Sequence, residues 1–277
     1  MVQASFSEGV AAGALGPTTP GRHNSDQPSD TDPPVGAFSA DVLAKMSHQL
    51  SSPLAGITGL TRIMLVRATT GQVDPVKLVQ QLEMIQSAAH RSMATVERVL
   101  DAARIELAAA SADFGRVDLC ALVAETAITP NPIAGRPATV VCTYPPQPVM
   151  VATDPDMVSR LLRELLDNAL TLADATDVHV KLGTDTGQVV VEVSDDGAGI
   201  ADQDQDRIFE AFERGSGAAK RDPGGVGMGL YLARKMAHRL GADLSLSSHL
   251  GAGSTFTITF ADPSDLPSPR SSPQPSG

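Results

Sequence analysis

Two glycine-rich turns carry residue types that could do chemistry in this sequence: DDGAGI at 195–200 and GGVGMGL at 224–230. A valine-rich run (189–194), predicted to be a strand, leads into the first turn, and a helix-like stretch (228–240) leads out of the second. Glycine lacks a Cβ, so its backbone can adopt positive φ and approach a ligand closely. A helix N-terminus presents unpaired N–H groups that bind anions. The two turns therefore predict a site for a phosphate-bearing ligand.

Carboxylate and amide side chains accompany these turns. Asp195 stands at the end of the predicted strand, where its carboxylate could accept a hydrogen bond from the amino group of a base. The segment LLRELLDNAL (161–170) places Glu164 and Asn168 one turn apart on the same helix face. The Asn168 amide oxygen can coordinate Mg²⁺, and Glu164 can hold a metal-bound water. An ordinary surface glutamate is an equally good interpretation of Glu164.

The order of these segments resembles the ATP-binding domain of sensor histidine kinases, a fold shared with gyrase, MutL and the heat-shock chaperones. The resemblance implies ATP and Mg²⁺ as cofactors and assigns Asn168 to the family's N box. In the gyrase-like relatives, a glutamate at the spacing of Glu164 is the general base for ATP hydrolysis. The resemblance also implies four further motifs. A first glycine box is matched by Asp195, Gly197 and Gly199, and a phenylalanine box by Phe209 and Phe212. A second glycine box is matched by Gly225, Gly227 and Gly229, and a strand that backs the adenine pocket by 251–258 with Thr255.

A polar segment with little periodicity separates Ile200 from Gly225 and predicts a mobile lid over the nucleotide. Arg214 and Lys220 in this segment could reach the β- or γ-phosphate. Solvated lid charges are nearly as good an interpretation of both residues. Phe209 and Phe212 are expected to anchor the lid to the domain rather than to touch ATP.

The N-terminal part of the chain predicts a helical hairpin. Apolar residues recur at steps of three and four from about Phe38 to Val66, and again from Pro75 to about Ala110. Asp74 is a possible N-cap, with Pro75 at the first helical position. The recurring apolar residues form a narrow stripe, called the seam, along each helix. Two helices with such seams leave apolar surface exposed, so we expect a homodimer with a four-helix bundle. The seams are Leu43, Met46, Leu50, Pro53, Ile57, Leu60 and Met64, and Val79, Leu82, Ala89, Met93, Val96, Leu100, Ala103 and Leu107.

His48 lies between two seam residues and is expected to point to solvent. The surrounding MSHQLSSPL (46–54) resembles the kinase H box, which implies that His48 accepts the phosphoryl group. A solvated surface histidine is the alternative interpretation. The family usually has an acidic residue where Gln49 stands, and Gln49 can orient the imidazole but cannot take its proton. Ser52 matches the position that the family uses for dephosphorylating its partner.

Composition narrows the class of protein. The chain has 277 residues, 42% hydrophobic and 19% charged, enough for one or two domains with proper cores. The net charge of −11 argues against nucleic acid or an anionic membrane surface as a main partner. Cys120 and Cys142 follow no metal-ligand spacing and are interpreted as small core residues in a reducing compartment, with a disulfide between them as the less favoured alternative. No apolar run approaches the length of a membrane span. We therefore expect a cytoplasmic protein that receives its input from a separate sensory protein.

The predicted fold class is α+β. We expect a disordered tail at 1–36, a dimerisation and histidine phosphotransfer domain at 37–112, an ATP-binding α/β sandwich at 113–261 with one mixed sheet, and a disordered tail at 262–277. The function expected is that of a soluble sensor histidine kinase that autophosphorylates His48 and passes the phosphoryl group to an Asp of a response regulator receiver domain.

Two alternatives remain open at this stage. Gln49, together with Thr171 where the family has a basic residue, favours a weakly active scaffold or a response-regulator phosphatase. Glu164 favours a pure ATPase of the gyrase or chaperone kind, which would leave the hairpin and His48 without a purpose.

Overall fold

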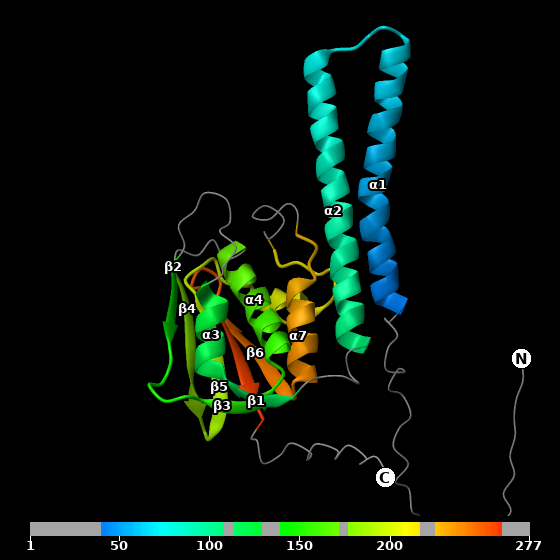
Figure 1. The fold of residues 1–277 in the computed structure, drawn as a ribbon. Coiled ribbons are helices and arrows are strands. Elements are labelled where there is room, and N and C mark those ends of the chain that lie inside the picture. The colour runs from blue at the N-terminus through cyan, green and yellow to red at the C-terminus, as the bar shows by residue number, and fades with distance from the viewer. Residues whose placement is uncertain (1–39, 108–113, 129–138, 172–176, 217–224, 262–277) are drawn as a thin grey trace, which may run out of the picture. The chain divides into compact units, whose positions relative to one another are not determined.

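The computed structural model describes residues 40–107, 114–128, 139–171, 177–216 and 225–261. The predicted tails and Lys220 lie outside these ranges. Two long helices come first, followed by an α/β domain (Figure 1). This order confirms the predicted fold class.

The hairpin consists of α1 (Ala40–Thr69) and α2 (Pro75–Leu107). Asp74 caps α2, because its Oδ1 accepts hydrogen bonds from the backbone N–H of Val76 at 3.0 Å and of Lys77 at 3.4 Å. This contact confirms the predicted start of the second helix. Helix α1 continues through Pro53, a residue that removes one backbone hydrogen bond from a helix interior.

The predicted seam of α1 is largely correct. Its residues from Met46 to Met64 are half-buried, and Pro53 is among them. The exception is Leu43, which is 44% exposed, whereas its neighbour Val42 is buried in the core cluster. The core cluster also contains Ala102 and Ile105 of α2.

The predicted seam of α2 needs a larger correction. Residues of the predicted stripe remain 44–60% exposed: Val79, Leu82, Met93, Val96 and Leu100. Lower exposure is found along a second stripe shifted by about one position: Leu78, Ile85, Ala88, Thr95, Ala102 and Ile105. Helix α2 is therefore apolar on two adjacent faces, and periodicity alone did not tell which face is covered within one chain.

The α/β domain contains a five-stranded mixed sheet in the order β2-β4-β5-β7-β6. The pair β2–β4 is parallel, and the other neighbours are antiparallel. Its strands are β2 (Thr139–Thr143), β4 (Asp177–Asp185), β5 (Gln188–Asp195), β6 (Ala242–Ser248) and β7 (Ser254–Phe260).

One strand pair lies outside this sheet. Strand β3 (Met150–Thr153) pairs with β1 (Gly115–Asp118) in a separate two-stranded antiparallel sheet. The expectation of a single mixed sheet was therefore incomplete. The sequence GRVD of β1 has no run of apolar residues, so it gave no strand signal.

Helices cover one face of the five-stranded sheet (Figure 1). The long ones are α3 (Leu119–Ile128), α4 (Pro155–Thr171) and α7 (Gly229–Arg239), and the short segments α5 (Asp202–Gln205) and η2 (Arg207–Phe209) lie between β5 and α7 in the chain. Strand β7 alternates buried and half-buried residues, as a strand with one face on a core does. The opposite side of that core is formed by the buried residues of helix α4: Val158, Leu161, Leu162, Leu165, Leu166 and Ala169.

Candidate nucleotide-binding site

The two glycine-rich turns and the polar side of α4 surround one cavity of about 310 Å³. This volume is at the lower end of the range typical of small-molecule sites. Predicted site residues from distant parts of the sequence converge on it: Glu164, Asn168, Asp195, Gly199, Arg214, Gly225, Gly227 and Gly229.

Asp195, the last residue of β5, is only 7% exposed. Its Oδ1 accepts a hydrogen bond from the Gly197 N–H at 3.0 Å. Burial raises the pKa of Asp195, while backbone hydrogen bonds from Gly197 and Ser254 lower it. A buried carboxylate at the wall of a cavity is suited to accept a hydrogen bond from a ligand, such as the amino group of a purine base.

Glycine is required at two turn positions for steric reasons. Gly199 has φ +64°, and a Cβ there would lie 2.0 Å from the backbone oxygen of His249. Gly227 has φ +73°, and a Cβ there would lie 2.7 Å from the backbone oxygen of Glu213. The turns can therefore pack against neighbouring backbone only because these side chains are absent.

Helix α4 brings three oxygen-bearing side chains to the cavity: Glu164, Asp167 and Asn168. The Glu164 side chain is 15% exposed and accepts a hydrogen bond from Arg98 of α2. Burial raises the pKa of Glu164, and the Arg98 guanidinium opposes that effect. Burial also raises the pKa of Asp167. Glu164 is therefore a cavity residue, and the alternative of an ordinary surface glutamate is wrong.

The second glycine turn lies directly beside Glu164. A Cβ on Gly229, the first residue of α7, would lie 3.0 Å from Glu164 Oε2. The start of a helix, with its unpaired N–H groups, thus lies next to the oxygen-bearing residues of α4. This is an arrangement in which a phosphate chain and a cation can be held together.

Two predicted ligand residues do not line the cavity. Gly197 donates its backbone N–H to Asp195 instead. The Thr255 hydroxyl lies 2.9 Å from the hydroxyl of Ser194, and Ser254 takes its place in the cavity lining. Successive residues of a strand point to opposite faces, so Ser254 shares the face of the buried Phe256 and Thr255 does not. This alternation was the signal that could have identified Ser254.

The phenylalanine box behaves as an anchor. Phe209 and Phe212 are buried, and the Phe209 ring meets the Phe256 ring edge-on with centroids 6.3 Å apart. The Phe212 N–H donates to the Gly227 backbone oxygen at 2.8 Å. Neither phenylalanine is among the residues that line the cavity, whereas Arg214 is.

His48 is exposed on α1, as the seam predicted, and does not line the nucleotide cavity. Its neighbours Gln49 and Ser52 line a groove on the hairpin together with Gly225 and Val226. These last two residues also line the nucleotide cavity. The groove beside His48 and the nucleotide cavity therefore share part of the second glycine turn.

Two family models match the chain. Residues 39–108 match the model of the His Kinase A (phospho-acceptor) domain, and residues 153–264 match that of the histidine kinase-, DNA gyrase B- and HSP90-like ATPase. The chain belongs to the sensor histidine kinase family. The hairpin corresponds to the phosphoacceptor domain of this family, and the domain that contains the cavity corresponds to its ATP-binding domain.

Curated relatives of the kinase agree with this assignment. The sensor-like histidine kinase SenX3 of Mycolicibacterium smegmatis is 28% identical over 232 residues, which cover 83% of this chain and 59% of SenX3. The sensor protein BceS of Halalkalibacterium halodurans is 46% identical over 112 residues, 40% of this chain and 33% of BceS. The kinase thus spans less than two thirds of the length of these relatives.

Solved structures show the same fold. The histidine kinase AdeS of Acinetobacter baumannii matches with a TM-score of 0.54 at 19% identity, over 77% of this chain and 97% of AdeS. Full-length ShkA in complex with AMPPNP matches with a TM-score of 0.52 at 25% identity, over 82% of this chain and 48% of ShkA. Within the described ranges, none of the helices combines the length and apolar character needed to cross a membrane.

Proposed function

We propose that this kinase uses ATP to phosphorylate His48 and then passes the phosphoryl group to an Asp of a response regulator receiver domain. The observation that carries the proposal is the pairing of two features in one chain. One is a cavity that combines a buried carboxylate with two close-packed glycine turns, and the other is an exposed histidine within a phosphoacceptor hairpin.

Different cavity residues bind different parts of ATP. The Asp195 carboxylate accepts from the adenine amino group, and the second glycine turn leads into α7, whose first N–H groups face the phosphates. Arg214 contributes positive charge from the lid segment. Binding of this kind accelerates phosphoryl transfer mainly by positioning the reactants and stabilising charge.

The charge of the cavity favours a divalent cation with the nucleotide. Five described residues that line it carry a carboxylate, against two arginines, Arg98 and Arg214: Glu164, Asp167, Asp195, Asp204 and Glu213. A polyanion would be repelled from such a site unless a cation accompanied it. The Asn168 amide oxygen and the Glu164 carboxylate are the oxygen donors that Mg²⁺ prefers, and we propose them as its ligands. Bound there, Mg²⁺ would neutralise phosphate charge.

The transfer itself needs a free imidazole nitrogen. His48 attacks the γ-phosphorus through Nε2, a P–N bond forms, and the P–O bond to the β-phosphate breaks so that ADP leaves. Gln49 can hold the ring through a hydrogen bond but cannot accept its other proton. In the second transfer, the P–N bond breaks and an Asp carboxylate of the receiver domain takes the phosphoryl group.

The hairpin is proposed to act as a homodimer. Its two helices leave large apolar side chains exposed, including Leu54 at 51%, Leu65 at 66% and Met93 at 60%. A second copy of the hairpin would cover these faces in a four-helix bundle. We also propose a separate sensory protein as the source of the input signal.

Incubation with γ-labelled ATP tests the proposal. The label is expected on the wild-type protein and to be acid-labile and base-stable, as phosphohistidine is. His48→Gln should abolish labelling and leave ATP affinity within a few-fold, because His48 does not line the nucleotide cavity. His90→Gln is a matched control, since His90 is an exposed histidine on α2. Wild-type labelling of the His48 variant would remove His48 as the acceptor.

A further inference from the structure

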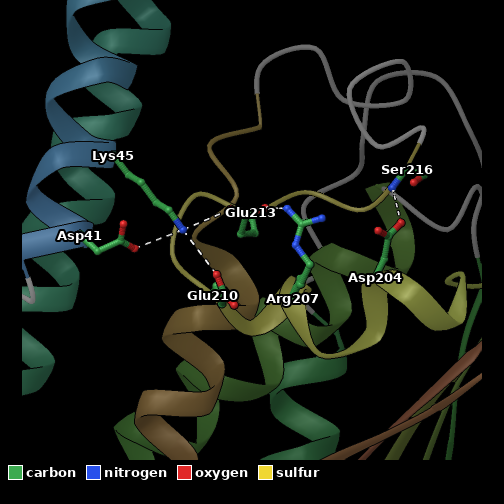
Figure 2. A network of polar contacts seen from close by, with 7 residues as sticks. All are labelled: Asp41, Lys45, Asp204, Arg207, Glu210, Glu213 and Ser216. Carbon is green, nitrogen blue, oxygen red and sulfur yellow. Dashed lines mark hydrogen bonds and ion pairs between the residues drawn. The ribbon is translucent and has the colours of Figure 1, made fainter. Parts of the chain in front are cut away.

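A cluster of charges joins the phosphoacceptor helix to Glu210 and Glu213, which lie within the segment predicted to be a lid. Figure 2 shows Lys45 of α1 directed at three carboxylates. Its Nζ lies 3.1 Å from Glu213 Oε1, 3.4 Å from Glu210 Oε2 and 3.3 Å from Asp41 Oδ2. The Glu213 carboxylate is the main cause of a raised Lys45 pKa, so the ammonium stays charged at neutral pH.

Glu213 connects this cluster to the nucleotide site. It lines the cavity, and its backbone oxygen lies against Gly227 of the second glycine turn. Its Oε2 also accepts from Arg207 at 2.7 Å, so the carboxylate is held from both sides (Figure 2). A movement of Glu213 would therefore shift the rim of the cavity.

Lys45 is close to the phosphoacceptor along the helix. His48 lies three positions further along the chain, so the two side chains lie about 60° apart around α1 and about 4.5 Å apart along its axis. They consequently occupy the same side of the helix. The contact with Glu213 thus attaches the rim of the nucleotide cavity to the side of α1 that carries His48.

We propose that Lys45 is a positioning residue for phosphorylation of His48, which it promotes by docking Glu210 and Glu213 onto the phosphoacceptor helix. This proposal rests on the proposed kinase function. Docking at this point limits the orientations that the ATP-binding domain can adopt toward His48, and such restriction is a main source of rate in phosphoryl transfer.

A second contact makes the docking directional. Arg98 of α2 pairs with Glu164, which lines the same cavity. One ion pair would leave the ATP-binding domain free to rotate about the contact. Contacts from both helices together define its orientation, since Arg160 also pairs with Asp101 and Lys235 with Glu106 near the end of α2. Partly exposed ion pairs are individually weak, so Lys45 adds to an orientation that burial of Val42, Ala102 and Ile105 in the core cluster also supports.

Variants of the full chain separate docking from a general structural role. Lys45→Ala should lower the single-turnover rate of His48 phosphorylation at saturating Mg-ATP several-fold, Lys45→Glu should lower it further, and Lys45→Arg should retain most of it. The affinity for a non-hydrolysable ATP analogue should stay within about twofold, because Lys45 does not line the cavity. The matched control is Lys77→Ala, since Lys77 pairs with Asp74 at the other end of the hairpin.

A charge reversal tests whether Lys45 acts through its ion pair with Glu210. Glu210 is an acceptor of Lys45 that does not line the cavity, so Glu210→Lys leaves the nucleotide site intact. The double variant Lys45→Glu with Glu210→Lys should recover part of the rate that Lys45→Glu loses. Salt should slow the wild type more steeply than Lys45→Ala, because the docking is electrostatic.

Carbodiimide cross-linking followed by mass spectrometry detects the contact without relying on activity. A Lys45 link to Glu210 or Glu213 in the wild type is expected. The proposal is overturned by an unchanged or increased rate in Lys45→Ala, by an equal loss in Lys77→Ala, or by no recovery on charge reversal. A wild-type protein that cross-links but acquires no label on His48 would refute the proposed function and, with it, a positioning role for Lys45.

Discussion

Replacing Asp195 by asparagine should weaken ATP binding without unfolding the protein. The Asp195 carboxylate is 7% exposed at the cavity wall, and one oxygen already accepts from the Gly197 N–H. Asparagine can keep that bond through its carbonyl oxygen, but its NH₂ group then faces the adenine amino group. A donor would meet a donor in a site with little water.

The size of the effect follows from the bond that is lost. A hydrogen bond to a charged group contributes about 1.5–3 kcal/mol. Since about 1.4 kcal/mol corresponds to tenfold in affinity, the Kd for ATP should rise about 10- to 150-fold.

In contrast to ATP binding, the thermal stability of the nucleotide-free protein should not be lowered by this substitution. Burial raises the Asp195 pKa, so the folded state holds a proton more tightly than the unfolded state does. The ionised carboxylate is therefore unfavourable in the folded state, and the free energy of unfolding falls as pH rises through the raised pKa. Asparagine cannot ionise, so Asp195→Asn without nucleotide should melt no lower than the wild type at neutral pH.

Titration with two nucleotides is the decisive assay. ATP and inosine triphosphate differ in that a carbonyl replaces the amino group of the base. The wild type should prefer ATP, and Asp195→Asn should reduce or reverse that preference because its NH₂ can donate to the carbonyl. Asp196→Asn removes a neighbouring negative charge and serves as a control. An unchanged Kd and an unchanged preference in Asp195→Asn would refute the role assigned to Asp195.

Two further substitutions test the phosphoacceptor helix and the second glycine turn. Gln49→Glu should raise the single-turnover autophosphorylation rate, by at most about 10²–10⁴-fold, because a carboxylate beside His48 can take the ring proton; a flat result with intact ATP binding and dimer would argue against a kinase limited by its missing base. Gly227→Ala should lower the free energy of unfolding by more than about 1 kcal/mol and weaken nucleotide binding, because φ is +73° and the new Cβ would lie 2.7 Å from Glu213 O. Thermal unfolding and titration measure both effects, with Gly183→Ala in open space as the control, and an equal loss in that control would contradict the steric argument.

The sequence alone was sufficient for features that depend on neighbours in the chain. Helical periodicity predicted both long helices, and Asp74 with Pro75 predicted where the second one begins. The side of α1 that carries His48 followed from the seam residues around it. Glycine spacing located both turns of the nucleotide site, because positive φ and close packing impose a local requirement on residue type.

Other features depended on tertiary packing. Helix α2 has two adjacent apolar faces, and only the positions of α1 and of the ATP-binding domain decide which of them is covered in one chain. Ser254, and not Thr255, reaches the cavity because the register of β7 against β5 determines which face points there. The pairs Arg98–Glu164 and Lys45–Glu213 join residues 66 and 168 positions apart. Contacts between such distant charges leave no local pattern, since they exist only after the helices and the ATP-binding domain have packed together.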